Sequence, residues 1–327
     1  MTQFPYDAAR THAAFVDRSA ERGRIAVSGA DRGAYLQGLL TNDIASLKAG
    51  EGCYAAYLTA QGRMIADVYV YELGDLMLLA VARDVKDTVL AKLDQFIFSE
   101  DVKLRDVTDT FAEIAIVGPH AAEVLAPLVQ TPLVELRDDG VVRTTTAGGA
   151  AAIVTRITDV GEPGYDVYVE RAGAADLMTA LEHDGVPRLD PESLDALRIE
   201  RGVPLWHRDM DAETIPLEAG IESRAISFTK GCYVGQEVII RVLHRGHGRV
   251  ARRLVGMKFG GGHVPIANAP IRSGDREIGA VTSAAFSPAL HAPVALGYVH
   301  RDFVEAGTKV AADGADGEVV ALPMTLG

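Results

Sequence analysis

The chain has 327 residues, of which 48% are hydrophobic and 24% are charged, a composition typical of a globular protein long enough for two or three domains. Asp and Glu number 45 against 32 Lys and Arg, which gives a net charge of -13. Such a charge repels nucleic-acid phosphates and anionic lipid, so we expect no direct binding of nucleic acid.

Membrane-spanning, secreted and disulfide-stabilised classes are excluded on similar grounds. No apolar run is long enough to cross a bilayer, and the N-terminus has no apolar signal-peptide core. With only Cys53 and Cys232, the chain has neither a disulfide framework nor a Cys-x-x-Cys zinc pair. We expect a cytoplasmic protein that contacts no membrane.

Helix and hairpin signals alternate through the first third of the chain. A first helix is predicted from Asp31, a candidate N-cap, to Thr41-Asn42-Asp43. A second, with an apolar stripe, begins at Asp84. Extended runs separated by short turns lie between them: Tyr54–Thr59, Met64–Tyr71 and Leu76–Val81. Short loops predict antiparallel strands, because parallel strands need long crossovers.

The middle of the chain repeats this alternation, with a Thr/Gly-rich boundary at residues 144–149. The clearest helix has Asp190 as N-cap, Pro191 at its first position and Gly202 just past its end. After about Val250 the chain becomes Gly-rich and short-stranded, which predicts a small all-β module. The other predicted elements here are strands 112–117, 151–157 and 165–169 and helices 121–129 and 174–181.

The segment Lys230-Gly231-Cys232-Tyr233-Val234-Gly235-Gln236-Glu237 is the densest group of polar side chains in the chain. Its two glycines permit positive φ and close approach to a ligand. Cys232 is a reactive thiol if a nearby cation lowers its pKa. Local chemistry alone favours the alternative, a small buried hydrophobe, by roughly two to one.

A basic stretch follows at Arg241–Arg253, with five arginines and two histidines but no acid. The stretch is either a binding site for a phosphate, a polyglutamate tail or an acidic partner, or a solvated basic face, and the two interpretations are equally good. His244 and His247 have no third ligand at a supportive spacing, so we expect no metal site.

Two carboxylates complete the candidates. Asp67 lies within an apolar run, on the same face as Ile65 and Tyr69, which predicts either a buried functional carboxylate or a charge on an edge strand. Glu162 lies in the turn Gly161-Glu162-Pro163-Gly164, where most glutamates are solvated.

Several of these motifs together resemble the YgfZ branch of the glycine-cleavage T-protein superfamily. The blocks that carry the resemblance, in chain order, are Leu39–Asp43, Tyr54–Tyr71, Gly161–Tyr165, Thr214–Gly220, Thr282-Ser283, Ser287–Leu290 and Ala295–Val299. Lys230–Glu237 matches the folate-binding YgfZ version, whereas aminomethyltransferases carry a different sequence there. Ala66 departs from the T-protein pattern, which often has a second acid at this position.

The resemblance implies a three-domain α+β fold with antiparallel sheets, helices and a C-terminal β-barrel domain. Domain 1 is expected to be discontinuous and to bind folate, and domain 2 to be ferredoxin-like. The expected boundaries are residues 1–48 with 145–242 for domain 1, 49–144 for domain 2 and 243–327 for the barrel.

The resemblance also implies a site. Asp67 matches the aspartate beside the folate nitrogens, Glu162 a glutamate that binds the pterin ring, and Arg198 an arginine near the glutamate tail. Catalytic roles are expected for Cys232 and Asp67. The expected folate-binding residues are Asp67, Glu162, Arg198, Lys230, Tyr233, Gln236 and Glu237, and no metal ligand is expected.

The implied function is that of a tetrahydrofolate-binding accessory protein for assembly or repair of iron–sulfur clusters. Its expected partners are a reduced folate and iron–sulfur cluster proteins or their assembly factors, with an indirect link to tRNA modification by radical enzymes. The alternative is a folate-dependent aminomethyltransferase. The sequence assigns no turnover to either.

Overall fold

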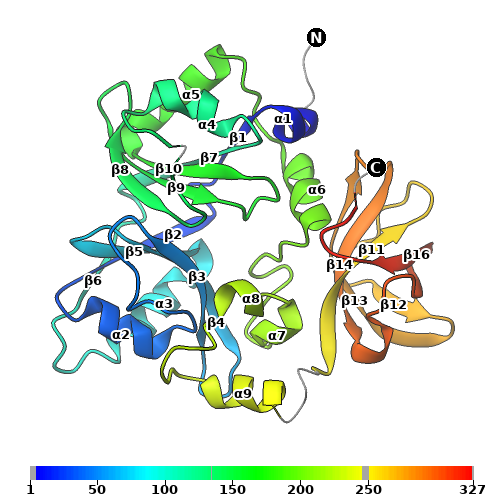
Figure 1. The fold of residues 1–327 in the computed structure, drawn as a ribbon. Coiled ribbons are helices and arrows are strands. Elements are labelled where there is room, and N and C mark those ends of the chain that lie inside the picture. Colours follow the sequence, from blue (N-terminus) through cyan, green and yellow to red (C-terminus); the bar gives the residue numbers. More distant parts are fainter. Residues whose placement is uncertain (1–4, 134, 245–249, 326–327) are drawn as a thin grey trace. The chain divides into compact units, whose positions relative to one another are not determined.

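The computed structural model describes residues 5–133, 135–244 and 250–325, which divide into two compact units (Figure 1). Unit 1 comprises Met1–Thr158, Pro163–Leu189 and Ser223–Gln236. Unit 2 comprises Asp159–Glu162, Asp190–Glu222 and Glu237–Gly327. The chain therefore passes between the units several times.

The first sheet of unit 1 has five antiparallel strands in the order β1-β7-β10-β9-β8. Helices α4 and α5 lie on its outer face (Figure 1), where apolar side chains of helix and sheet form one core. The strands are β1 (Ala14–Asp17), β7 (Phe111–Val117), β8 (Val141–Thr145), β9 (Ala151–Ile157) and β10 (Gly164–Glu170), and the helices are α1 (Pro5–Thr11), α4 (Ala121–Leu125) and α5 (Ala174–His183).

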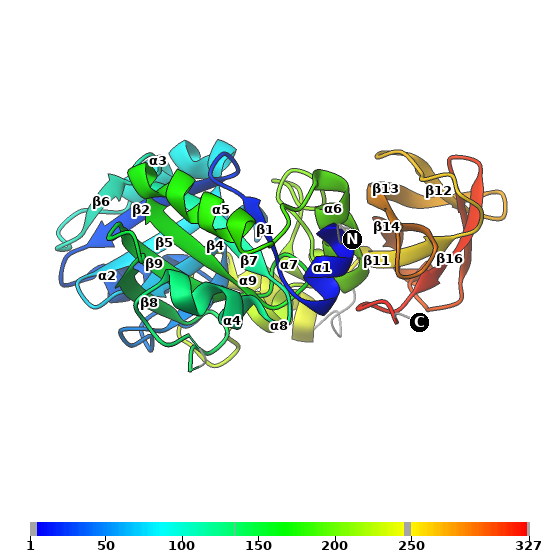
Figure 2. The same ribbon diagram turned by 90° about the horizontal axis from the view of Figure 1, so that it is seen from above.

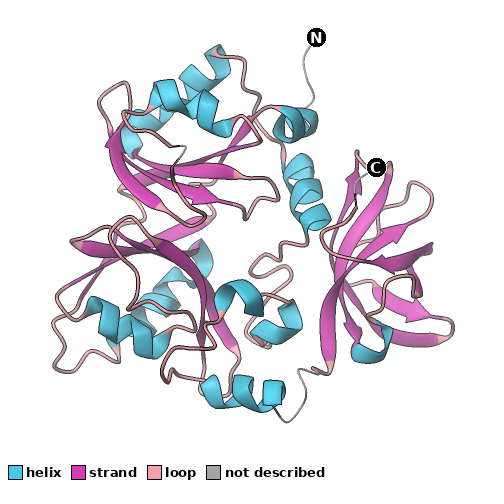
Figure 3. Ribbon diagram, viewed as in Figure 1, coloured by secondary structure: helices cyan, strands magenta, loops and turns pink. Residues whose placement is uncertain are grey.

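The second sheet of unit 1 also has five antiparallel strands, in the order β3-β4-β5-β2-β6. Helices α2 and α3 lie on its outer face (Figure 3). The strands are β2 (Arg22–Ser28), β3 (Gly52–Leu58), β4 (Met64–Glu72), β5 (Leu76–Ala82) and β6 (Lys103–Asp106), and the helices are α2 (Arg32–Leu39) and α3 (Lys86–Asp94).

The inner faces of the two sheets meet through aromatic and charged side chains. Tyr71 of β4 contacts Tyr168 of β10, with ring centroids 6.4 Å apart. Arg24 of β2 donates to Glu113 of β7 at 2.8 Å, and both side chains are fully buried. Removing either partner of such a pair leaves an uncompensated buried charge, so the pair fixes how the sheets stack.

Unit 2 contains the long helix α6 (Pro191–Arg201), the short helix α7 (Pro216–Ala219) and a closed antiparallel barrel (Figure 2). The barrel order is β11-β14-β13-β12-β15-β16. Its strands are β11 (Arg252–Phe259), β12 (Pro270–Ser273), β13 (Arg276–Ser287), β14 (Ala292–His300), β15 (Lys309–Ala312) and β16 (Ala315–Val320). The remaining helices are α8 (Glu222–Ala225), α9 (Gln236–His244) and 3₁₀ turns at Arg83–Val85, Ala126–Leu128, Arg171–Gly173 and Arg301–Phe303.

A buried carboxylate, Asp209, joins α6 to the barrel within unit 2. Its Oδ2 accepts from Arg198 Nη1 at 2.8 Å and from the Leu205 backbone N–H at 3.0 Å. Its Oδ1 accepts from the Thr282 hydroxyl of β13. The Tyr298 hydroxyl of β14 donates to the backbone carbonyl of Asp209 at 2.8 Å. One residue in a loop thus satisfies donors from three elements.

The predicted fold class is confirmed: antiparallel sheets are combined with helices, and the segment after Val250 closes into a barrel. The helix signals at residues 190–202 are also confirmed, since Asp190 accepts from the Ser193 N–H and Gly202 has φ 79°. Asp31 stands at the N-cap of α2 but caps no N–H of the helix; it accepts instead from the Asp101 N–H.

The predicted boundaries of three domains stay a prediction. Residues 52–82 form strands β3 to β5, and β2 and β6 complete the same sheet. Among the described residues, no helix is long and apolar enough to cross a membrane.

The Asp209 contacts predict a large loss of stability for Asp209→Ala. The substitution removes a buried carboxylate partner from the Arg198 guanidinium, which is only 1% exposed. Such a loss lowers the free energy of unfolding by about 3–5 kcal/mol. Urea denaturation measures the free energy of unfolding. Asp275→Ala, at an exposed position of the barrel, is the control and should change it by less than about 0.5 kcal/mol. Equal effects of the two substitutions would contradict the assigned role of Asp209.

Candidate functional site

Asp67 lies in the middle of a polar and aromatic patch on β4. It is 7% exposed, and its Oδ2 accepts from the Tyr54 hydroxyl of the neighbouring strand β3 at 3.2 Å. The predicted burial is confirmed. The edge-strand alternative is wrong, because β4 pairs with β3 on one side and with β5 on the other.

Aromatic rings and guanidinium groups surround this carboxylate. Tyr54 and Tyr69 are cross-strand partners with ring centroids 4.8 Å apart. The Arg22 guanidinium lies 5.4 Å from the Tyr69 ring and that of Arg224 lies 5.1 Å from the Tyr54 ring. We call Tyr54, Asp67, Tyr69, Arg22 and Arg224 the Asp67 cluster. Burial and the Asp67 charge raise the pKa of Tyr54 well above its ordinary value, so its hydroxyl remains a donor.

The segment 223–236 is tied to the Asp67 sheet by the residues that follow α2. The Thr41 hydroxyl donates to the Ala225 carbonyl at 2.6 Å and accepts from the Ala56 N–H at 2.8 Å. The Asn42 amide donates to the carbonyls of Tyr54 at 2.8 Å and Arg224 at 2.9 Å. Arg224 is therefore held beside Tyr54 through its backbone.

Lys230 closes the C-terminal end of α2. Its Nζ donates to the carbonyls of Gln37, Leu40 and Asn42 at 2.6, 2.7 and 2.7 Å. An ammonium group has three donors, and these contacts use all three. Burial lowers the pKa of Lys230 to about 8, which leaves the group mainly protonated at pH 7. A contact between Lys230 and folate stays a prediction, and this geometry favours a structural role.

The two glycines of the Lys230–Glu237 segment differ. Gly235 has φ 87°, and a Cβ added there would lie 2.6 Å from the Thr59 carbonyl oxygen. A Cβ added at Gly231 would meet nothing within 4 Å. Only Gly235 therefore needs the conformational freedom of glycine.

The two cysteines of unit 1 also differ. Cys232 is exposed, so the interpretation of Cys232 as a packed hydrophobe is wrong. Cys53 is partly buried, and burial raises its pKa to about 12, which keeps it a thiol at neutral pH. Tyr233, whose ring lies 5.2 Å from Lys230 Nζ, is buried, whereas Gln236 is partly buried and Glu237 is exposed.

The other predicted folate-binding residues, Glu162 and Arg198, belong to unit 2. Glu162 is partly exposed. Arg198 donates from Nε to Asp195 at 2.8 Å and from Nη2 to the Ser283 hydroxyl at 2.7 Å, besides its bond to Asp209. Its contact with a folate tail stays a prediction. These bonds disfavour that contact, because they already use most of the N–H donors of a buried guanidinium.

The described part of the basic stretch is mostly paired. Arg252 donates to Glu218 at 3.0 Å and Arg253 to Glu222 at 3.1 Å. Arg245, His247 and Arg249, and the side chain of His244, lie outside the described part of the structure. Among described residues, no group of three His, Cys, Asp or Glu could hold a metal ion.

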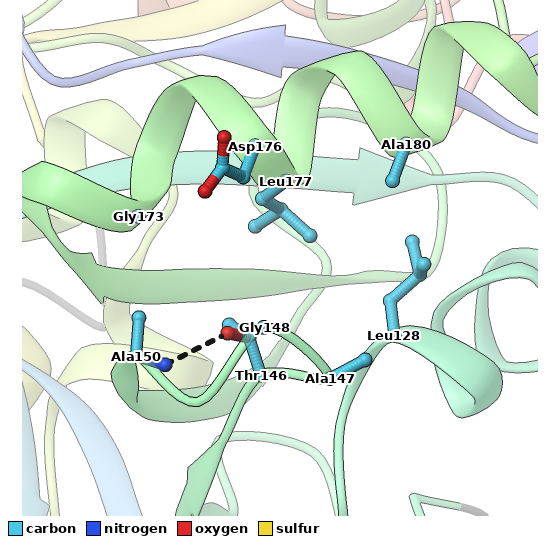
Figure 4. A pocket seen from close by; sticks show the side chains of 9 residues that line it. All are labelled: Leu128, Thr146, Ala147, Gly148, Ala150, Gly173, Asp176, Leu177 and Ala180. Atoms are coloured by element: carbon cyan, nitrogen blue, oxygen red, sulfur yellow. Dashed lines mark hydrogen bonds between the residues drawn. The ribbon is translucent and has the colours of Figure 1, made fainter.

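Two hollows lie away from the predicted site residues. A cavity of about 70 Å³ separates α5 from the 146–150 turn in unit 1 and is lined mainly by Ala, Gly and Leu (Figure 4). A hollow of about 460 Å³ lies between the first turns of α6 and the barrel in unit 2, with acidic and apolar walls. Neither contains a residue of the Asp67 cluster.

Sequence reasoning missed Tyr54 and Arg224. Tyr54 had a signal, because its place on the strand that pairs with residues 64–71 puts it opposite Tyr69. Arg224 had none, because its neighbour Tyr54 is far away in the sequence.

The difference between the glycines predicts different effects of substitution. Gly235→Ala should destabilise the protein by at least about 2 kcal/mol, because alanine is strained at positive φ and its Cβ would collide with Thr59. Gly231→Ala, the matched control, should change stability by less than about 0.5 kcal/mol. Thermal denaturation checks both. A neutral Gly235→Ala would show that the loop is free to move away from β3.

Comparisons with known proteins agree with this architecture. The family model of the GCVT N-terminal domain matches residues 4–230, and that of the glycine cleavage T-protein C-terminal barrel domain matches residues 252–325. An aminomethyltransferase of Streptomyces avermitilis is 34% identical over 327 residues, covering 97% of this chain and 87% of that protein. One of Rubrobacter xylanophilus is 33% identical over 294 residues, covering 90% and 78%.

A solved structure extends the likeness to three dimensions. The crystal structure of glycine cleavage system aminomethyltransferase T from Bartonella henselae has a TM-score of 0.85 and 25% identity, and covers 98% of this chain and 88% of that one. Both family models and the relatives therefore span nearly the whole sequence. The chain belongs to the glycine-cleavage T-protein family.

Proposed function

We propose that the chain binds a reduced folate at the Asp67 cluster. The observation that carries this proposal is the buried Asp67 carboxylate on an aromatic face, oriented by the Tyr54 hydroxyl. A pterin ring is flat and presents amino and N–H donors, which suit a carboxylate acceptor and neighbouring tyrosine rings. The relatives, named aminomethyltransferases, support the same class of ligand.

Aminomethyl transfer to folate is the reaction that these relatives favour. Bound folate supplies the nitrogens that carry the one-carbon unit. In this chain, Asp67 accepts a hydrogen bond from an N–H of the ligand and stabilises positive charge that develops on the reacting nitrogen. Its burial strengthens that interaction, since water screens it little. Tyr54 holds one carboxylate oxygen and so orients the other.

A role in iron–sulfur cluster maintenance is the second candidate, and the exposed Cys232 favours it. Lys230 anchors the start of its loop, and near the end the Val234 N–H donates to the Gly38 carbonyl at 3.2 Å, so the thiol lies on a segment held on both sides. In this candidate, Cys232 contacts an iron–sulfur protein or its cluster while folate occupies the Asp67 cluster. The match of Lys230–Glu237 to the YgfZ version supports the same branch.

Folate binding is tested by Asp67→Asn. Replacing the charged acceptor should weaken binding of tetrahydrofolate by about 10- to 100-fold, measured by anaerobic titration calorimetry. Asp94→Asn, at an exposed position of α3, should bind like the wild type. Wild-type protein that binds no reduced folate would refute the proposal.

The two candidates make opposite predictions for turnover and for Cys232. Aminomethyl transfer predicts that tetrahydrofolate and an aminomethyl-lipoyl carrier give methylenetetrahydrofolate, ammonia and the free dihydrolipoyl carrier, with Cys232→Ser active and Asp67→Asn impaired. The maintenance role predicts no such product. It also predicts that Cys232→Ser fails to restore iron–sulfur enzyme activity in a deletion strain, while the control Cys53→Ser restores it. Full rescue by Cys232→Ser would exclude a role for this thiol.

A further inference from the structure

The hollow between the first turns of α6 and the barrel, which we call the α6 hollow, is large enough for a small molecule. Both of its walls belong to unit 2, and Arg198 of α6 joins them by donating to the Ser283 hydroxyl of β13 at 2.7 Å. Its volume of about 460 Å³ is in the range of small-ligand pockets. Three of its lining residues are alanines, Ala196, Ala284 and Ala285, and their short side chains leave the space open.

The helix wall of the α6 hollow carries a net negative charge. Asp195 is neutralised, because Arg198 and Arg208 donate to it at 2.8 and 2.7 Å. Asp190 caps the helix and has no arginine or lysine partner within the described part of the chain. Glu192 is exposed and forms neither a hydrogen bond nor an ion pair with any described residue. These two carboxylates outweigh the roughly half positive charge of a helix N-terminus, so this wall attracts a cation.

The barrel wall of the α6 hollow is apolar and presents an accessible aromatic ring. Phe286 of β13 is 45% exposed and lines the hollow together with Val264 and Pro288. The face of an aromatic ring attracts a cation, and apolar walls favour a ligand that has apolar surface of its own. An anion would be repelled by the helix wall, and an uncharged apolar molecule would gain nothing from its carboxylates. A cation with an apolar body is the ligand that suits both walls.

We propose that the α6 hollow binds a small organic cation, an amine or amidine carried on an apolar body. The charged group lies at Glu192 and Asp190, and the apolar body lies against Phe286 and the alanines. The net charge of -13 favours the approach of such a ligand. The lining residues belong to unit 2 and the Asp67 cluster to unit 1, so this inference does not depend on folate binding.

Benzamidine and benzamide test the proposal, because they share a shape and differ in charge at neutral pH. Wild-type protein should bind benzamidine about five- to tenfold more tightly, the ratio expected for an exposed charge contact together with a cation–π contact. Nuclear magnetic resonance titration measures both affinities. The backbone amide signals of residues 192–196 and 284–286 should shift during the titration.

Two exposed side chains of the α6 hollow provide variants that should fold normally. Glu192→Gln should weaken the binding of benzamidine about threefold and leave that of benzamide unchanged, because it removes one exposed charge contact. Phe286→Ala should weaken the binding of both ligands, because it removes the aromatic wall. Asp275→Asn, at an exposed position of the same barrel, is the control and should keep the wild-type preference.

Equal affinities of the wild type for the two ligands would overturn the proposal. Signal shifts confined to amides outside the α6 hollow would overturn it as well. A Glu192→Gln variant that keeps the full preference for benzamidine would overturn the placement of the charged group at Glu192.

Discussion

Hydrogen bonds between residues 37–42 and residues 224–230 are the constraint on which the Asp67 cluster depends. Asn42 and Thr41 reach the carbonyls of Arg224 and Ala225, and Lys230 reaches back to three carbonyls at the end of α2. Nearly two hundred residues of chain separate the two segments. The acceptors are all backbone carbonyls, so the contacts fix the path of the chain. Arg224 and Cys232 take their positions from that path.

The Lys230–Glu237 segment therefore combines residues with different tasks. Lys230 and the Val234 N–H attach the segment to α2, Gly235 lies close to the Thr59 carbonyl, and Tyr233 is buried beside Lys230. Cys232 lies between these anchors and is exposed. Taken as letters, the segment suggests a loop whose side chains all surround one ligand. In the structure, Lys230 and Tyr233 hold the loop in place, and the Cys232 thiol is exposed to solvent.

Local signals predicted the elements of the fold well, because those elements depend on neighbouring residues. Asp190, Pro191 and Gly202 mark both ends of α6, and alternation predicted the burial of Asp67. The tertiary roles were beyond such signals. Arg198 meets Asp209 and Ser283, and Arg224 meets Tyr54, only after segments distant in sequence have packed. A sequence shows that an arginine is present but not which carboxylate pairs with it in the folded protein.

Ala66 is the departure from the T-protein pattern that bears on the reaction. Successive side chains of a strand point to opposite faces, and Asp67 shares its face with Tyr54 and Tyr69. The Ala66 side chain therefore points away from the Asp67 cluster, toward the outer face of the sheet, and is fully buried. Its methyl group leaves the carboxylate, the tyrosines and Arg224 unchanged. The alanine thus places no acid on the opposite face of the sheet and leaves the carboxylate and the aromatic rings of the Asp67 cluster as they are.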